Sequence, residues 1–77
     1  MGLKEERNKK GYSAHKLSLL SNISQSTIES FEGNYRNINT CRIKTLCKLA
    51  LTLDCSILDL LDDPETIYLF KLAKKGN

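Results

Sequence analysis

The sequence predicts an all-α protein: a compact domain of five helices followed by a sixth helix at the C-terminal end. Three observations predict this class. Apolar residues recur at helical spacing, and the clearest series is Ile43, Leu46, Leu49, Ala50 and Leu53. Serine, threonine, asparagine and aspartate, which favour helix starts, stand directly before such patterns. No segment alternates apolar and polar residues as a half-buried strand would.

Three helices are expected in the N-terminal half. They cover residues 3–10, 14–20 and 25 to about 32. Gly11 is expected to end the first helix, and Ser13 and Ser24 are natural N-caps for the second and third. Asn22, between the second and third helices, can adopt the left-handed conformation that a tight turn requires.

Three more helices are expected after the polar loop GNYRNIN, residues 33–39. Asn39 or Thr40 is predicted to cap a fourth helix, which carries the apolar series given above. Ser56 is predicted to cap a short fifth helix over residues 57–61. Asp63 before Pro64 is a cap followed by proline at the first helical position, which begins a sixth helix reaching about residue 74. The chain is therefore divided into a domain of residues 1–62 and a C-terminal helical segment of residues 63–77.

Length and composition indicate one small domain. The 77 residues are 40% apolar and 27% charged, enough for a modest core and too few for two domains. No apolar run approaches the roughly 20 residues that span a bilayer, and no leader signals export. Cys41, Cys47 and Cys55 lack a paired spacing, so we expect reduced thiols in a cytoplasmic protein, without a disulfide or a metal site.

The charge of the chain is unevenly distributed. The net charge is +3, and lysine and arginine outnumber acidic residues within residues 1–20. Acidic residues gather later, at Asp54, Asp59, Asp62, Asp63 and Glu65. This arrangement suits a protein that presents one face to a polyanion, although an ordinary solvated surface would produce the same pattern.

The stretch SNISQSTIES, residues 21–30, is unusually polar for a structured segment. At about 100° per residue, Thr27, Ile28 and Phe31 share the inward arc of the helix expected over 25–32. The opposite arc holds Gln25, Ser26, Glu29 and Ser30. Lysine–glutamate pairs are usual on a helix face that serves only solubility. Short hydroxyl and amide groups suit the DNA major groove instead, where glutamine can bond adenine N6 and N7.

Residues 14–33 resemble the helix-turn-helix of the lambda-repressor-like (Cro and Xre) DNA-binding family. The matching landmarks are Leu17, Ser18, Asn22, Ile23, the run SQSTI at 24–28, and Glu32. The resemblance continues through the apolar positions between Ile43 and Leu61, so that it covers about residues 3–61. Ala14 departs from the family pattern, where a phosphate-binding glutamine is common, and Glu6 stands where an apolar residue is usual.

The resemblance also implies roles for individual residues. The family's base-reading positions correspond to Gln25, Ser26 and Ser30, and Glu29 on the same arc is expected to face a cytosine edge or solvent. The positions that grip phosphates correspond to Lys16, Ser24, Thr27, Asn34, Tyr35, Arg36 and Asn37. No lysine or arginine lies on the reading arc, so affinity is expected to come mainly from flanking cations.

The function implied by the resemblance is that of a bacterial or phage transcriptional regulator. Such proteins bind operator DNA as homodimers on inverted half-sites, repress by blocking polymerase, and need no cofactor. The alternative is an antitoxin-like or adaptor protein whose main ligand is another protein. An enzyme is not expected, because His15 is the only histidine and no glycine-rich phosphate loop is present.

The expected sixth helix carries more apolar surface than one side of packing requires. Its apolar residues include Ile67, Phe70 and Leu72, and the second helix also ends in two leucines, Leu19 and Leu20. The sixth helix could fold back and cover these leucines, or it could form part of a two-fold interface. We favour the interface, with Ile67, Phe70 and Leu72 as its candidate residues, because two reading helices need a rigid spacing of about 34 Å.

Overall fold

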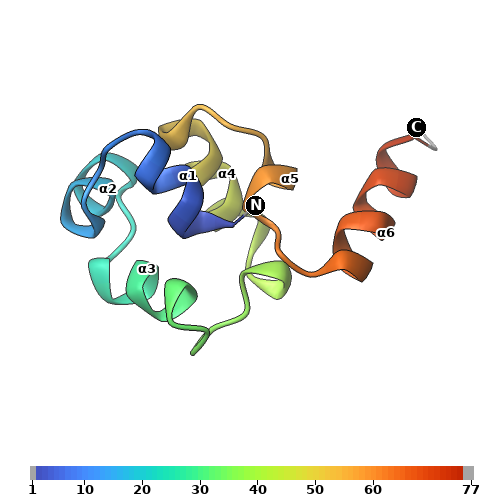
Figure 1. Cartoon of the computed structure of the whole chain (residues 1–77), viewed down its shortest axis with the longest axis horizontal. Coiled ribbons are helices and arrows are strands. Elements are labelled where there is room, and N and C mark those ends of the chain that lie inside the picture. The colour runs from blue at the N-terminus through green and yellow to red at the C-terminus, as the bar shows by residue number, and fades with distance from the viewer. Residues whose placement is uncertain (1, 76–77) are drawn as a thin grey trace.

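The computed structural model describes residues 2–75, and every regular element in this part of the chain is helical (Figure 1). The elements are α1 (Leu3–Lys9), α2 (Ala14–Ser21), α3 (Gln25–Glu32), a short 3-10 helix η1 (Ile38–Thr40), α4 (Ile43–Leu53), α5 (Ile57–Leu60) and α6 (Pro64–Lys75). The predicted all-α class is confirmed, and the ends of the predicted α1, α2, α5 and α6 differ from the structure by one residue.

Helices α1 to α5 surround one apolar core. α2 packs against α3 and α4, and α1 packs against α3 and α5. The largest fully buried side chains come from α2, α3, α4 and the α5 region: Leu17, Ile28, Leu49, Leu53, Leu60 and Leu61. Each such side chain contributes about 1.5–3 kcal/mol on burial, so the core fixes the relative positions of these helices.

Local side-chain caps begin most of the helices, as the sequence predicts. The hydroxyl oxygens of Ser13 and Ser24 accept backbone hydrogen bonds at the starts of α2 and α3, at 3.0 and 3.2 Å. Ser56 and Asp59 form a reciprocal capping box at α5. The Asp63 carboxylate accepts the Thr66 backbone N–H at 3.0 Å in the first turn of α6.

The predicted cap of the fourth helix is wrong. Asn39 and Thr40 lie in η1, and α4 begins after Arg42 without any side-chain cap. Asn39 is used elsewhere: its Oδ1 accepts the backbone N–H groups of Asp62 and Asp63 at 3.0 and 3.1 Å, and its Nδ2 donates to the Asp62 carboxylate at 2.7 Å. The Asn39 side chain therefore makes a tertiary contact instead of the helix cap that local propensity predicted.

The turn between α2 and α3 has the predicted geometry. Asn22 is left-handed, with φ 60° and ψ 36°, and its N–H donates to Ser18 O at 3.0 Å. Asparagine tolerates this conformation better than most residues, so the chain reverses within a few residues and α3 crosses over α2.

Helix α1 accommodates a charged residue where the resemblance led us to expect an apolar one. Glu6 is 8% exposed, and Lys9 Nζ lies 3.1 Å from its carboxylate. Leu3, on the same helix, is buried in the core. Glu6 is therefore paired with Lys9, while Leu3 holds α1 against the core.

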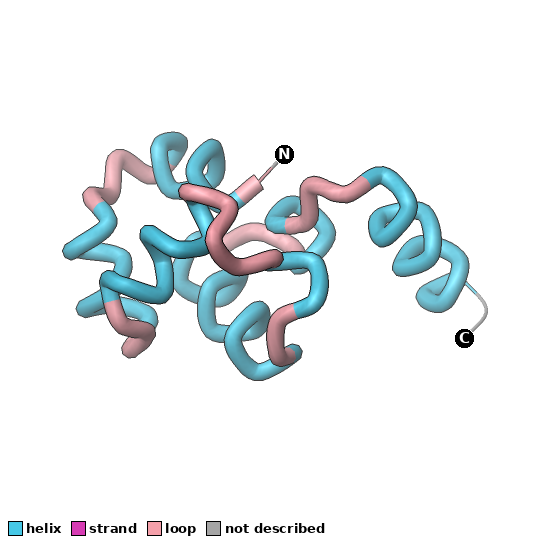
Figure 2. Tube along the Cα trace, turned by 90° about the horizontal axis from the view of Figure 1, so that it is seen from below, coloured by secondary structure: helices cyan, strands magenta, loops and turns pink. Residues whose placement is uncertain are grey.

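Helix α6 lies apart from the main body, at one end of the molecule, in both Figure 1 and Figure 2. Ile67 and Phe70 are half-buried and pack against the core, whereas the exposed apolar side chains of the helix are Tyr68, Leu69 and Leu72. Leu19 and Leu20 are 69% and 52% exposed, so the alternative in which α6 covers these leucines is wrong. Among the described residues, no helix is both long enough and apolar enough to cross a membrane.

Candidate nucleic-acid interface

Helix α3 is divided into a buried face and an accessible face. Ile28 is 0% exposed and Phe31 7% exposed, so they hold the helix to the core. On the other face Ser26 and Glu29 are exposed, while Gln25 and Ser30 are half-buried. The inward positions predicted for Ile28 and Phe31 are confirmed, whereas Thr27, predicted on the same arc, is half-buried like Gln25 and Ser30.

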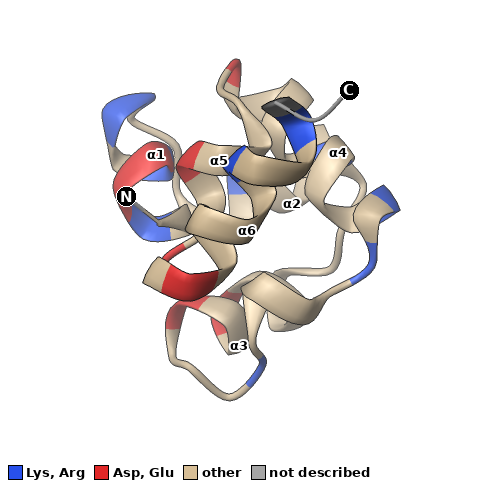
Figure 3. Cartoon of the chain, turned by 90° about the vertical axis from the view of Figure 1, so that its right-hand side faces the viewer, with Lys and Arg blue, Asp and Glu red and all other residues tan. Residues whose placement is uncertain are grey.

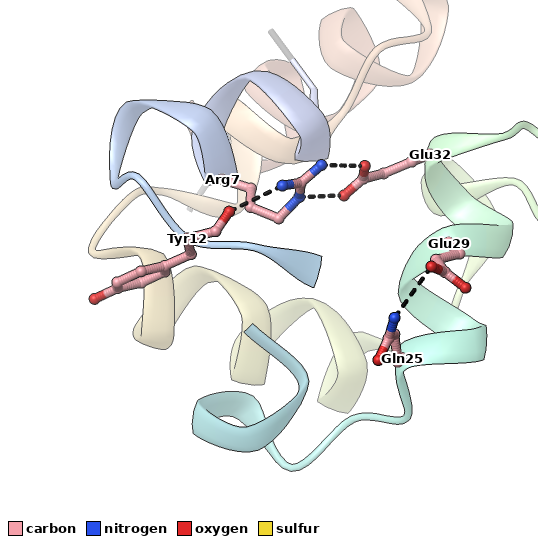
Figure 4. Close-up of polar contacts among 5 residues, drawn as sticks. All are labelled: Arg7, Tyr12, Gln25, Glu29 and Glu32. Carbon is pink, nitrogen blue, oxygen red and sulfur yellow. Dashed lines mark hydrogen bonds and ion pairs between the residues drawn. The ribbon is translucent and has the colours of Figure 1, made fainter. Parts of the chain in front are cut away.

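The far end of α3 is fixed to α1 by an ion pair. The Nε and Nη2 of Arg7 donate to the two carboxylate oxygens of Glu32, both at 2.7 Å, and Nη1 donates to Tyr12 O at 2.9 Å (Figure 4). The side chains of Arg7 and Glu32 are only 13% and 11% exposed. The hydrogen bonds to Glu32 raise the pKa of Arg7 above its ordinary value. This contact orients the candidate reading helix, and nothing in the local sequence pattern indicated it.

Polar side chains on the outer face of α3 contact one another. Gln25 Nε2 donates to Glu29 Oε2 at 3.2 Å, as Figure 4 shows, and Gln25 Oε1 lies 3.3 Å from Nδ1 of His15 in α2. The hydroxyls of Ser24 and Thr27 are 2.8 Å apart at the start of the helix. The glutamine amide is thus held between two helices before any ligand binds.

The loop after α3 is folded against the end of that helix. The N–H groups of Tyr35 and Arg36 both donate to Ser30 O, at 2.8 and 3.1 Å. A Cβ atom at Gly33 would stand 3.0 Å from the Tyr35 ring, so glycine allows this ring to lie over the loop. Asn34, with φ 65°, makes the left-handed turn. Tyr35 remains 88% exposed and available to a ligand.

A cationic groove lies between α3 and α4. Its basic side chains are Arg36 from the loop, Arg42 at the start of α4 and Lys48 within α4. Thr27 and Asn37, two of the candidate phosphate contacts, line the same groove. Figure 3 shows basic segments along this loop and at the start of α4. These three cations make the groove suited to a phosphate.

Arg42, just before α4, and Lys48, within it, were not predicted from the sequence as phosphate contacts. The sequence evidence for a phosphate-binding role of these two residues was weak, because lysine and arginine also occur at many solvated positions. The remaining candidates do not line the groove. Asn34 lines a neighbouring hollow, in which Arg36 lies together with the acidic residues Asp62 and Asp63. Lys16 is exposed at the start of α2, with Nζ 5.7 Å from the centre of the Tyr12 ring.

One cluster elsewhere in the described chain has the composition of a metal site. Ligand atoms of Glu6, Cys55 and Asp59 lie within 4.8 Å of one another. Burial, together with these carboxylates, raises the pKa of the Cys55 thiol to about 11. Each carboxylate already has a partner, Lys9 for Glu6 and Ser56 for Asp59. These contacts give the cluster a structural role at the junction of α1 and α5.

Helix α2, the turn at Asn22 and helix α3 together form a helix-turn-helix, and residues of α3 line one side of a cationic groove. A family model described as helix-turn-helix matches residues 3–60. The chain therefore belongs to the lambda-repressor-like helix-turn-helix family, whose members bind DNA. No curated protein and no solved structure matches the chain.

Proposed function

We propose that this protein is a transcriptional repressor that binds operator DNA sequence-specifically, with α3 in the major groove. The observation that carries the proposal is the adjacency of two surfaces. The accessible face of α3 displays short hydrogen-bonding groups, and the groove of Arg36, Arg42 and Lys48 is lined in part by Thr27 and Phe31 of the same helix. Base edges demand the first kind of surface and phosphates the second.

Base recognition is assigned to the outer face of α3. Gln25 can bond adenine through both ends of its amide, and the hydroxyls of Ser26 and Ser30 can donate to or accept from either base pair. Because Ser26 and Ser30 are short, they allow the helix backbone to approach the groove floor closely. Glu29 suits the exocyclic amine of cytosine and repels phosphate, so its place on the reading face limits the sequences tolerated there.

Backbone contacts are assigned to the residues around the groove. Thr27, Arg36 and Asn37 line it. Arg42 and Lys48 add two cations that the family resemblance did not imply. Ser24, Lys16, Asn34 and Tyr35 complete the proposed perimeter. For each phosphate that a cation neutralises, the slope of log K against log salt steepens by about 0.9. In this proposal the phosphate contacts supply most of the affinity for DNA.

The repressor is proposed to act as a homodimer in the cytoplasm, with α6 as the dimerisation element. Ile67 and Phe70 pack against the core of the same chain. Three other apolar side chains of α6 are exposed: Tyr68 by 61%, Leu69 by 53% and Leu72 by 48%. Exposed apolar side chains on one short helix favour a partner. A second copy is the partner that the function requires, because two α3 helices must reach half-sites about 34 Å apart. Leu72 therefore faces the partner in this proposal, and Ile67 and Phe70 set the angle of the helix.

Selection of bound sequences from a random pool of duplex DNA tests the proposal directly. We expect an enriched motif composed of two inverted half-sites one helical turn apart. A matched selection with the Arg36→Ala/Arg42→Ala variant, which keeps the reading face, should enrich the same motif with lower recovery. A pool that shows no enriched sequence would contradict sequence-specific binding and favour the protein-binding alternative.

A further inference from the structure

A chain of three polar side chains joins the two helices of the helix-turn-helix. His15 Nδ1 of α2 lies 3.3 Å from Gln25 Oε1 of α3, and Gln25 Nε2 donates to Glu29 Oε2 at 3.2 Å. The middle member is the residue to which the proposed function assigns adenine recognition. Figure 4 shows the Gln25 amide and the Glu29 carboxylate facing each other along the outer face of α3.

The carboxylate fixes which way round the amide lies. A carboxylate accepts hydrogen bonds and does not donate, so the amide nitrogen of Gln25 must face Glu29. The amide oxygen then faces α2, where it can only accept. The imidazole nitrogen opposite it, His15 Nδ1, must therefore carry the proton, either as the neutral Nδ1–H tautomer or as the imidazolium.

The amide held in this way keeps one acceptor and one donor free. Oε1 has a second lone pair after accepting from His15, and Nε2 has a second hydrogen after donating to Glu29. Adenine offers N6–H and N7 in the major groove, which match this remaining acceptor and donor. Without the His15 donor only the contact with Glu29 holds the amide, and the reversed orientation would place a donor where adenine presents a donor.

We propose that His15 is a specificity-determining positioning residue: it orients the Gln25 amide and so sets the preference for adenine at one base pair. The proposal rests on the proposed DNA-binding function and deepens it. Glu29 acts here as the second orienting group as well as a reading-face residue. Both side chains of the His15–Gln25 bond are accessible to water in the free protein, so the bond contributes little to folding and its effect appears in the DNA complex.

The test compares two substitutions of similar size. His15→Asn keeps an N–H donor near the position of Nδ1, whereas His15→Leu keeps the bulk and removes the donor. Each full-length variant is titrated against the operator selected by the wild-type protein. Each is also titrated against a duplex changed only at the base pair whose preference is lost in Gln25→Ala. Thermal melting of the free variants verifies that they fold.

We expect the wild-type protein to discriminate at that base pair by about tenfold or more, the range of one bidentate contact. His15→Leu should reduce the ratio by about three- to tenfold while discrimination elsewhere in the operator persists, and His15→Asn should restore it to within about twofold. An unchanged ratio in His15→Leu, an equal affinity loss on every sequence, or a failed rescue by asparagine overturns the role of His15. A wild-type protein that selects no sequence overturns the proposed function itself.

Discussion

The guanidinium of Arg7 and the carboxylate of Glu32 are joined by two hydrogen bonds of 2.7 Å, which tie α1 to the last residue of α3. A bidentate pair of this kind restricts both position and angle. The N-terminal end of α3 is held differently, by the Ser24 cap and by the contact between His15 and Gln25. The proposed reading helix is therefore fixed at both ends by polar contacts and in the middle by Ile28 and Phe31.

Removal of Arg7 should destabilise the protein strongly. Arg7→Met leaves the Glu32 carboxylate, only 11% exposed, without its cation, and we expect the free energy of unfolding to fall by about 3 kcal/mol. The double variant Arg7→Met/Glu32→Leu should recover most of this loss, because apolar side chains can replace a buried ion pair at little cost. Urea unfolding of the wild type, both single variants and the double variant measures the coupling. Additive losses would show that the pair does not act as a unit.

Phe31 should be the most costly aromatic side chain to truncate. It is 7% exposed on the inner face of α3, so Phe31→Ala should lower the free energy of unfolding by about 3–5 kcal/mol through lost burial and a residual cavity. Ser26→Ala, on the exposed face of the same helix, is the matched control and should melt within a few degrees of the wild type. Equal melting temperatures for the two variants would contradict the assignment of the faces.

The capping box of α5 should make stability depend on pH. Hydrogen bonds from the backbone and hydroxyl of Ser56 lower the pKa of Asp59 below its ordinary value. Such a carboxylate adds stability above its unfolded pKa of about 3.9, and the contribution disappears as the pH falls through the lower, folded value. Asp59→Asn should therefore melt below the wild type at neutral pH, and the difference should shrink in acid. Glu65→Gln, an exposed position outside the box, serves as control, and a difference that widens in acid would contradict this account.

Gln25 and Arg42 should differ in how their loss affects DNA binding. Gln25→Ala should weaken the best operator by about 1–3 kcal/mol and relax preference at one base pair. Arg42→Ala should weaken specific and random DNA alike and reduce the slope of log K against log salt by about 1, and Arg36→Ala should do the same. Binding isotherms at several salt concentrations separate the two effects. The same loss of affinity on specific and random DNA for both types of variant would contradict the assignment of base recognition to Gln25 and phosphate binding to Arg36 and Arg42.

Features set by neighbouring residues could be predicted from the sequence. The caps at Ser13, Ser24 and Ser56 and the left-handed turn at Asn22 depend on contacts within a few residues, and the structure contains each of them. The inner face of α3 was predictable for the same reason, because helical periodicity alone brings Ile28 and Phe31 to one side.

Features that depend on tertiary packing could not be predicted in this way. The ion pair of Arg7 and Glu32 spans 25 positions, and the amide of Asn39 bonds Asp62, 23 positions away, instead of capping α4. The cationic groove is assembled from α3, the loop after it and α4, so Arg42 was not distinguished from other surface cations. Local sequence pattern carries no information on which distant side chains meet.

Substitutions on the outer side of α6 should separate dimerisation from folding. Leu69→Glu/Leu72→Glu places two charges on side chains that are 53% and 48% exposed, so the fold of residues 2–62 should persist. If α6 forms the two-fold interface, burial of these charges is unfavourable, and a dimer should become a monomer with greatly reduced operator affinity. Lys71→Glu, an exposed charge reversal on the same helix, is the control. Sedimentation and operator titration decide the matter: a wild-type protein that is monomeric at high concentration, or a double variant that remains dimeric, rules out α6 as the interface.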